Sequence, residues 1–249
     1  MTAVRIELGT RSLILDPSGA AFCEASGLLV VADLHLETGS AFARRGLLLP
    51  PYDTAATLHR LEALITRLRP SVVVSLGDAF HDAKGHLSLP AMERRLLQSL
   101  CGKGRWIWIS GNHDPLPPEG LAGEALAVFV DGDLVCRHVP KPGPTTMESG
   151  FEIAGHLHPK ALAQGTRLRL RRPCFLSDGS RLVLPAFGSY TGGLNALDDD
   201  VSGLFAGGYD AYLLGKDRVF RLAHHQLLAE PPSPRMDVIR HLRLGVRHG

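Results

Sequence analysis

The sequence has few cysteines and no long apolar run, and each scarcity excludes a class of protein. Its four cysteines lie far apart, without a Cys-x-x-Cys pair or a repeated spacing. We therefore expect reduced thiols, not a disulfide framework or a zinc–thiolate cluster. No stretch approaches the about 18 uncharged apolar residues of a membrane span. The first residues also lack the apolar core of a signal peptide, so we expect a cytoplasmic protein.

Net charge is also low. The 27 basic and 25 acidic residues leave a formal charge of +2, which does not by itself indicate a nucleic-acid partner. Arginines cluster at residues 167–172 and again in the C-terminal segment, where they can contact phosphates. Alternating arginines on an exposed strand more commonly form a solvated face. The compositional excess is in histidine, with 12 residues, and it directs attention to metal sites.

The length of 249 residues and hydrophobic content of 45% predict one sizeable globular domain. We place this domain at residues 1–230. The Pro231-Pro-Ser-Pro234 segment then predicts a stiff linker, and residues 231–249 form a Pro-rich linker with a short basic C-terminal tail.

Strands and helices alternate in the first half of the sequence. Apolar residues at intervals of three and four predict a helix at 53–68, with Asp53 as its cap and Pro70 just beyond its end. This alternation predicts right-handed crossovers and a parallel sheet, and therefore an α/β fold. In the second half we expect strands with few long helices between them. The expected strands are 4–8, 11–15, 20–24, 28–32, 71–76, 106–109, 134–137, 152–154, 181–184 and 211–214; the second expected helix is 90–100.

Metal-competent side chains follow the strands of the first half. Open α/β sheets bind ligands at the carboxyl ends of their strands, so the topology gathers these groups in one crevice. Asp33 and His35 are two residues apart, and in an extended backbone they would point to the same side. His156 and His158 repeat this spacing. Gly77 precedes Asp78, and we expect its missing side chain to let backbone and metal approach closely.

The donor types predict a pair of hard or borderline ions. Carboxylate, imidazole and amide groups without thiolate suit Mn²⁺, with iron or Zn²⁺ as alternatives. Two such ions about 3.5–4 Å apart can clamp a phosphate and ionise a bridging water. Asp78 is the natural bridge, since one carboxylate can offer an oxygen to each ion. The predicted metal ligands are Asp33, His35, Asp78, Asn112, His138, His156 and His158.

Each motif taken alone has an ordinary structural explanation. An isolated Asp-x-His is weak evidence, and Gly-Asp after a strand is often only a turn. Gly155-His-Leu-His158 is more specific, because two close histidines are rarely both structural. His138 has a surface histidine as its alternative. His81 and Asp82 are expected to belong to a solvated loop, the alternative being that they line the pocket.

The ordered motif series resembles the calcineurin-like metallophosphoesterase superfamily. Its Asp-x-His, Gly-Asp, Gly-Asn-His-Asp/Glu, His and Gly-His-x-His signature matches residues 32–35, 77–78, 111–114, 138 and 155–158. The resemblance implies a four-layer α/β/β/α sandwich with two central mixed sheets flanked by helices. It assigns Asp33, His35, Asp78 and His158 to one ion, and Asp78, Asn112, His138 and His156 to the other. His113 would protonate the leaving group and Asp114 would orient its imidazole.

Further segments resemble the ligase-associated DNA damage response endonuclease branch of that superfamily. They are Asp33-Leu-His-Leu-Glu37, Gly155-His-Leu-His-Pro159, Pro173-Cys-Phe-Leu-Ser177 and Leu184-Pro-Ala-Phe-Gly-Ser-Tyr-Thr-Gly-Gly193. The branch name implies an association with a DNA ligase and a helicase. The glycine-rich end of the last segment can offer backbone N–H groups or Tyr190 to a substrate, or can be a simple turn.

The sequence thus predicts a metal-dependent phosphoesterase, best described as a phosphodiesterase or nuclease linked to DNA repair. The expected mechanism is attack by a metal-bridging hydroxide, with His113 as general acid. One alternative is a phosphodiesterase or phosphomonoesterase acting on small nucleotides. A second is a non-catalytic metal-binding scaffold, against which the retained histidines argue.

Overall fold

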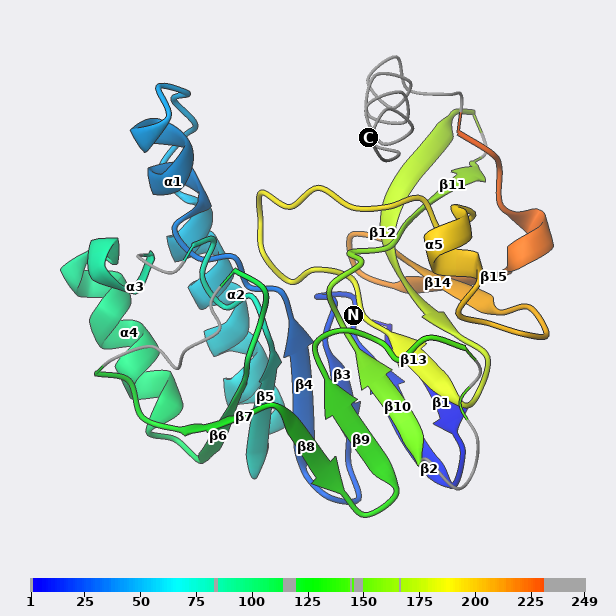
Figure 1. The fold of residues 1–249 in the computed structure, drawn as a ribbon, viewed down its shortest axis with the longest axis horizontal. Helices are drawn as coiled ribbons and strands as arrows, with labels where there is room; N and C mark the ends of the chain where they lie inside the picture. Colours follow the sequence, from blue (N-terminus) through cyan, green and yellow to red (C-terminus); the bar gives the residue numbers. More distant parts are fainter. Residues whose placement is uncertain are drawn as a thin grey trace, which may run out of the picture.

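The computed structural model describes residues 2–82, 85–113, 120–143, 145, 150–165 and 167–230. Two β-sheets pack face to face in the middle of this part, and helices cover the outer face of the first sheet (Figure 1). None of the described helices is long and apolar enough to cross a membrane. The domain predicted at residues 1–230 stays a prediction, and so do the linker and basic tail at 231–249, which lie outside the described residues.

The first sheet has seven strands in the same order as in the sequence. Its first four strands form an antiparallel meander, and the fourth to seventh run parallel. The parallel half is the crossover arrangement that the strand–helix alternation predicts. The strands are β1 (Val4–Leu8), β2 (Arg11–Leu15), β3 (Ala21–Cys23), β4 (Leu28–Ala32), β5 (Val72–Leu76), β6 (Arg105–Ile109) and β7 (Glu124–Leu126).

The second sheet is mixed and has eight strands, ordered β15-β14-β12-β13-β10-β9-β8 with β11 paired to β12. Its parallel pairs β9–β10 and β10–β13 lie at the centre of this order. The strands are β8 (Val128–Asp131), β9 (Leu134–Arg137), β10 (Phe151–Ala154), β11 (Lys160–Gln164), β12 (Arg169–Ser177), β13 (Arg181–Val183), β14 (Asp210–Leu214) and β15 (Val219–Ala223).

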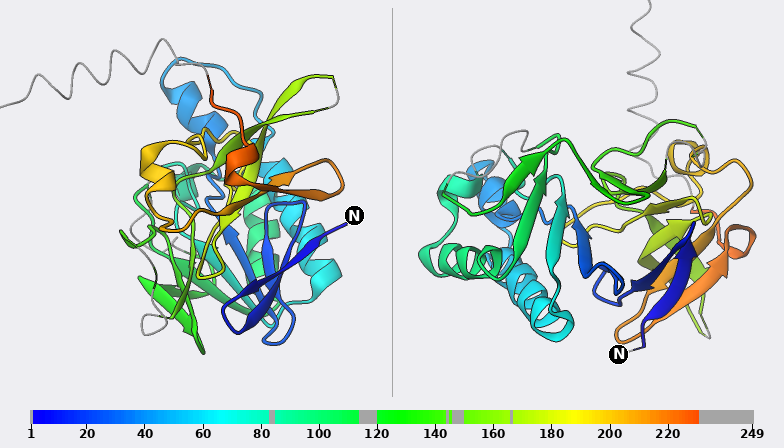
Figure 2. Two further views of the ribbon diagram at one scale, coloured as in Figure 1. Left: turned by 90° about the vertical axis from the view of Figure 1, so that its right-hand side faces the viewer. Right: turned by 90° about the horizontal axis from the view of Figure 1, so that it is seen from below.

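The helices lie mainly on one side of the molecule (Figures 1 and 2). Asp53 does not cap α2 as predicted: Tyr52 is the N-cap residue, and the Asp53 carboxylate instead accepts the Gly39 N–H at 3.1 Å, which ties α2 to α1. The helices are α1 (Thr38–Arg44), α2 (Asp53–Leu68), α3 (Gly85–Ser88), α4 (Ala91–Cys101), α5 (Asp199–Ser202) and the 3-10 helix η2 (His224–Gln226).

Alternation along β4 shows how the layers are held. Leu28, Val30 and Ala32 point into the core between the sheets, whereas Leu29 and Val31 pack under α2 and α4. The strand is buried on both faces, as its continuous apolar run predicts. A third apolar cluster lies on the outer face of the second sheet, where residues of β11 to β14 pack against α5 and adjoining loops. The predicted four-layer sandwich is confirmed, with a thin fourth layer.

All four cysteines are buried and free, which confirms the absence of a disulfide framework. Trp106 and Trp108 are 2% and 4% exposed and belong to the helix-side core. They therefore contribute packing, not a surface for stacking bases.

Candidate metal centre

The predicted ligands follow strands of both sheets at a common edge. Asp33 and His35 follow β4, Asp78 follows β5, and Asn112 and His113 follow β6. His138 follows β9, while His156 and His158 follow β10 in the second sheet. Backbone hydrogen bonds connect these segments, from His35 N to Asp78 O at 2.9 Å and from Gly155 N to His138 O at 3.0 Å.

One group of donors consists of Asp33, His35 and His158, whose candidate ligand atoms all lie within 4.8 Å of one another. The Nε2 atoms of the two histidines are 3.2 Å apart. Asp33 Oδ1 lies 3.3 Å from His158 Nε2. The Asp33 carboxylate is fully buried, and its Oδ2 accepts the His156 N–H at 2.9 Å.

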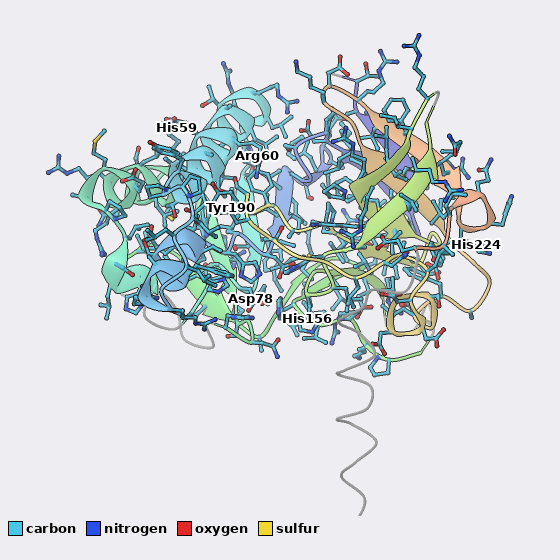
Figure 3. All side chains as sticks on the ribbon, turned by 90° about the horizontal axis from the view of Figure 1, so that it is seen from above. His59, Arg60, Asp78, His156, Tyr190 and His224 are labelled. Carbon is cyan, nitrogen blue, oxygen red and sulfur yellow. The ribbon has the colours of Figure 1, made fainter. Side chains whose placement is uncertain are left out.

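A second group consists of Asp78, His138 and His156, with the same 4.8 Å limit between ligand atoms. His138 Nε2 lies 3.4 Å from Asp78 Oδ2 and 3.2 Å from His156 Nδ1. Asp33 Oδ1 is also 3.6 Å from His138 Nδ1, so the two groups are neighbours. Figure 3 shows Asp78 and His156 near each other at this edge.

The donor set fits divalent cations. Asp33 Oδ1 is buried without a hydrogen-bond partner, which is unfavourable for a carboxylate oxygen unless a cation satisfies it. His138 Nδ1 donates to the Leu76 carbonyl at 2.9 Å, since a carbonyl can only accept, and this leaves Nε2 with a lone pair when the ring is neutral. Histidine ligands are commonly oriented by such a bond. Oxygen and imidazole donors without thiolate suit Mn²⁺, iron or Zn²⁺.

The electrostatics of the site follow from burial and from its carboxylates. Burial lowers the pKa of His35 to about 4, so this ring is neutral and able to donate to a metal at pH 7. Burial alone would lower the pKa of His138, but the hydrogen bond to Asp78 and the charges of Asp33 and Asp78 raise it. Burial would raise the pKa of Asp78, yet hydrogen bonds from His138 and the His113 N–H hold it far below its ordinary value.

The backbone reaches this geometry in a way that the sequence reasoning did not predict. Seven described non-glycine residues have a positive φ, and five of them are predicted ligands: Asp33, His35, Asp78, His156 and His158, with φ of 54°, 42°, 44°, 70° and 46°. The expectation that each Asp/His-x-His pair lies on extended backbone is therefore wrong. Left-handed residues cost free energy, and their clustering at a site is typical of a functional constraint.

Two glycines make room for these side chains. A Cβ on Gly77, which has φ of +67°, would lie 2.4 Å from His138 Nδ1, so Gly77 is needed for this histidine as well as for its backbone conformation. A Cβ on Gly155 would lie 2.8 Å from Asp33 Oδ2. We expected the missing side chain of Gly77 to let the backbone approach the metal. In the structure the backbone of Gly77 instead approaches the side chain of His138, a predicted ligand.

His138 is 4% exposed, so the alternative of a surface histidine is wrong. His81 also differs from expectation: it is partly buried, and its ring centroid lies 5.8 Å from that of His35 and 5.7 Å from that of His113. It belongs to the site and not to a solvated loop, whereas Asp82 pairs with Arg44. The sequence signal that could have placed His81 at the site is its position three residues after the predicted ligand Asp78.

His113 is exposed at the rim of the site. Its backbone N–H donates to Asp78 Oδ1 at 2.9 Å, and its Nδ1 donates to the His81 carbonyl at 2.8 Å. This carbonyl was not foreseen as a partner. Asp114, predicted to orient the ring, lies outside the described residues. Asn112 is exposed beside His113, and its role as a ligand stays a prediction.

A family model matches this chain, and two solved structures are similar to it. The family model "Calcineurin-like phosphoesterase" matches residues 27–215. The chain is similar in structure to the nuclease MPE of Pseudomonas putida, with a TM-score of 0.68, 26% identity, and coverage of 89% of this chain and 100% of that one. YfcE, a phosphoesterase from E. coli, aligns with a TM-score of 0.41 and 14% identity over 79% of this chain and 98% of that one.

No curated protein matches the sequence significantly. The family model nevertheless spans most of the chain, including the motifs at residues 32–35, 77–78, 111–114 and 155–158. The chain belongs to the calcineurin-like phosphoesterase family and is a metal-dependent phosphoesterase.

Proposed function

We propose that the protein is a two-metal phosphodiesterase that acts as a nuclease on DNA. The observation that carries this proposal is the pair of adjacent donor groups, Asp33/His35/His158 and Asp78/His138/His156. The similarity to a nuclease over the whole of that chain supports a nucleic-acid substrate. A pair of ions suits a phosphodiester, because it can stabilise both the attacking and the leaving oxygen.

In this proposal the seven predicted ligands would hold two divalent ions, Mn²⁺ being the favoured metal, and the Asp78 carboxylate would serve both. The ions, when bound, supply Lewis acidity and an activated water. The protein supplies orientation: the Leu76 carbonyl fixes the His138 ring, and the His156 N–H holds the Asp33 carboxylate.

His113 is the proposed general acid. Because its Nδ1 donates to the His81 carbonyl, its Nε2 is the nitrogen left to deliver a proton to the departing ester oxygen. The ring is exposed at the rim, where an extended substrate can reach it. Asp114 is proposed to assist this orientation.

Association with a DNA ligase and a helicase, and a role in DNA repair, are part of the same proposal and rest on the branch resemblance of residues 33–37 and 184–193. The four free buried thiols fit a cytoplasmic location. The sequence analysis offered the arginines of β12 as contacts for phosphates. Arg171 is less available for this role, since it already pairs with Glu230 at 2.6 Å.

A hydrolysis panel tests the proposed activity. The purified protein with Mn²⁺ is assayed on bis-p-nitrophenyl phosphate, on p-nitrophenyl phosphate, and on single- and double-stranded DNA. We expect the diester to be hydrolysed faster than the monoester, and DNA to be cleaved. Preference for the monoester, or hydrolysis of the diester without any cleavage of DNA, would refute the nuclease assignment.

A further inference from the structure

A second pocket, here called the basic pocket, lies against the loop at residues 186–191. It has a volume of about 460 Å³. Its polar lining comes from Ser18, Arg60, Lys160, Ser189, Thr191 and Lys216. These residues belong to the β2–β3 turn, α2, the start of β11, the loop itself and the β14–β15 turn. No metal ligand predicted from the sequence lines it.

The loop at 186–191 connects this pocket to the metal centre. The Gly188 N–H donates to the Asp33 carbonyl at 3.0 Å, while Phe187, Ser189 and Thr191 line the basic pocket. The loop therefore both supports the Asp33 segment and forms a wall of the pocket. In Figure 3, Tyr190 of this loop lies between Arg60 and Asp78.

Three cations line the pocket and no carboxylate does. Lys160 Nζ donates to the Thr191 carbonyl at 2.8 Å, and Arg60 donates to the Phe187 carbonyl with its guanidinium 4.5 Å above the Phe187 ring. Among the described residues, no ion pair involves Arg60, Lys160 or Lys216. The nearby Asp16 is occupied, since it pairs with Arg67 at 2.6 Å and accepts the Ser18 N–H at 2.9 Å.

Two of the residues that line the pocket each have a polar side-chain atom without a hydrogen-bond partner. Ser18 Oγ and Arg60 Nε are both buried without a hydrogen bond. Burial lowers the pKa of Arg60, and no charged group opposes this shift. Burial and the charge of Arg171 lower the pKa of Lys160, although Glu230 acts in the opposite direction. A ligand with several acceptor oxygens and a negative charge would satisfy all of these groups.

We propose that the basic pocket binds a phosphate group of the substrate strand, at a position other than the bond that is hydrolysed. Arginine, lysine and hydroxyl donors together suit a phosphate, because it offers several charged acceptor oxygens. This inference rests on the proposed nuclease function. It explains how the enzyme would favour a polynucleotide over a diester that carries a single phosphate. A free phosphate has the same chemistry, and the experiment separates the two sources.

The test uses Lys216→Glu and Lys160→Met, with Lys103→Glu as the matched control. Lys103 is exposed at the end of α4, beside the amino-terminal end of β6 and therefore at the edge opposite the metal centre. Binding of a labelled single-stranded 12-nucleotide DNA is measured with EDTA present, so that nothing is cleaved. We expect each pocket variant to weaken binding about three- to ten-fold and to flatten its salt dependence. The control should match wild type.

Turnover of bis-p-nitrophenyl phosphate with Mn²⁺ should be unchanged in both pocket variants, while KM for DNA rises. If DNA binding and KM stay at wild-type values but inorganic phosphate raises the melting temperature of wild type and not of Lys216→Glu, the occupant is free phosphate and the substrate-strand assignment is overturned. If neither ligand distinguishes the variants, the pocket is not a phosphate site. Loss of all wild-type hydrolysis would instead refute the proposed function, and the EDTA binding result would still decide the pocket.

Discussion

At the scale of single residues, the hydrogen bond made by one ring nitrogen of a histidine determines what the other ring nitrogen can do. His113 and His138 each donate Nδ1–H to a carbonyl, of His81 and of Leu76 respectively. Their surroundings then differ: His138 is buried beside Asp33 and Asp78, whereas His113 is exposed at the rim. Two histidines with the same hydrogen bond therefore suit two roles, a ligand and a proton donor.

Replacing His113 tests this difference. His113→Ala should retain both ions, because His113 belongs to neither donor group, and should lose about 10²–10⁴ in turnover of a diester with a poor leaving group. Steady-state kinetics and elemental analysis on the same preparation measure the two effects. His59→Ala, exposed on α2, serves as control. Near-wild-type turnover in His113→Ala would rule out the proposed general acid.

Asp78 should behave in the opposite way. Its carboxylate has one oxygen 3.4 Å from His138 Nε2, and the other accepts the His113 N–H. Asp78→Asn removes the charge that a bridging ligand supplies, so metal content should fall from two ions per chain towards one or none. Elemental analysis after dialysis against Mn²⁺ measures this, with the exposed Asp217→Asn as control. Two ions retained in Asp78→Asn would count against the bridge.

At the scale of elements, the metal centre depends on loops that touch backbone to backbone. The loop after β13 packs so closely on the segment after β4 that a Cβ on Gly188 would lie 2.4 Å from the Leu34 carbonyl oxygen. Gly192, in the same loop, has open space around it. The two glycines therefore differ in packing, and neither has a positive φ.

This difference predicts unequal effects of alanine. Gly188→Ala should lower the free energy of unfolding by about 1–3 kcal/mol through overpacking, and should weaken metal binding by moving Asp33. Gly192→Ala should stay within about 0.5 kcal/mol of wild type. Urea unfolding and Mn²⁺ titration measure both. Equal stability of the two variants would show that the loop adapts without displacing the ligand segment.

At the scale of the whole molecule, the predicted ions connect the two sheets. Asp33 and Asp78 come from the first sheet, and His138 and His156 from the second. Ions held by these groups bind only the folded state, so they should stabilise the sandwich as a unit. The expected gain is about 2.7 kcal/mol for each ion when the free metal is at 100 times its Kd.

Chelation of both ions should therefore lower the melting temperature of the Mn²⁺-loaded protein by about 10–20 °C. Differential scanning calorimetry with and without EDTA measures this shift. The double variant Asp33→Asn/Asp78→Asn is the control, because it should melt at the same temperature with and without chelator. An equal shift in wild type and in the double variant would mean that the effect of EDTA does not come from this centre.

Sequence patterns alone predicted an α/β fold and the six side chains that form the two donor groups, whereas the four-layer arrangement was implied by the family resemblance. The continuous apolar run of β4 and the spacing of α2 encode burial directly, because period two and period 3.6 follow from backbone geometry. These patterns also predicted the strand ends after which the donors lie, since parallel strands place their carboxyl ends at one edge. Short or irregular elements such as α1 and β11 were not predicted, because their few residues carry too little periodicity.

Only the tertiary structure decided how the donors converge. Asp33 and His35 join one donor group through left-handed backbone, which non-glycine residues adopt only where surrounding contacts enforce it. The burial of His138, the place of His81 and the basic pocket each arise where segments distant in sequence pack together. Local residue patterns indicate which side chains can act as metal donors. Long-range packing sets the distances between these side chains and their burial, and therefore their chemistry.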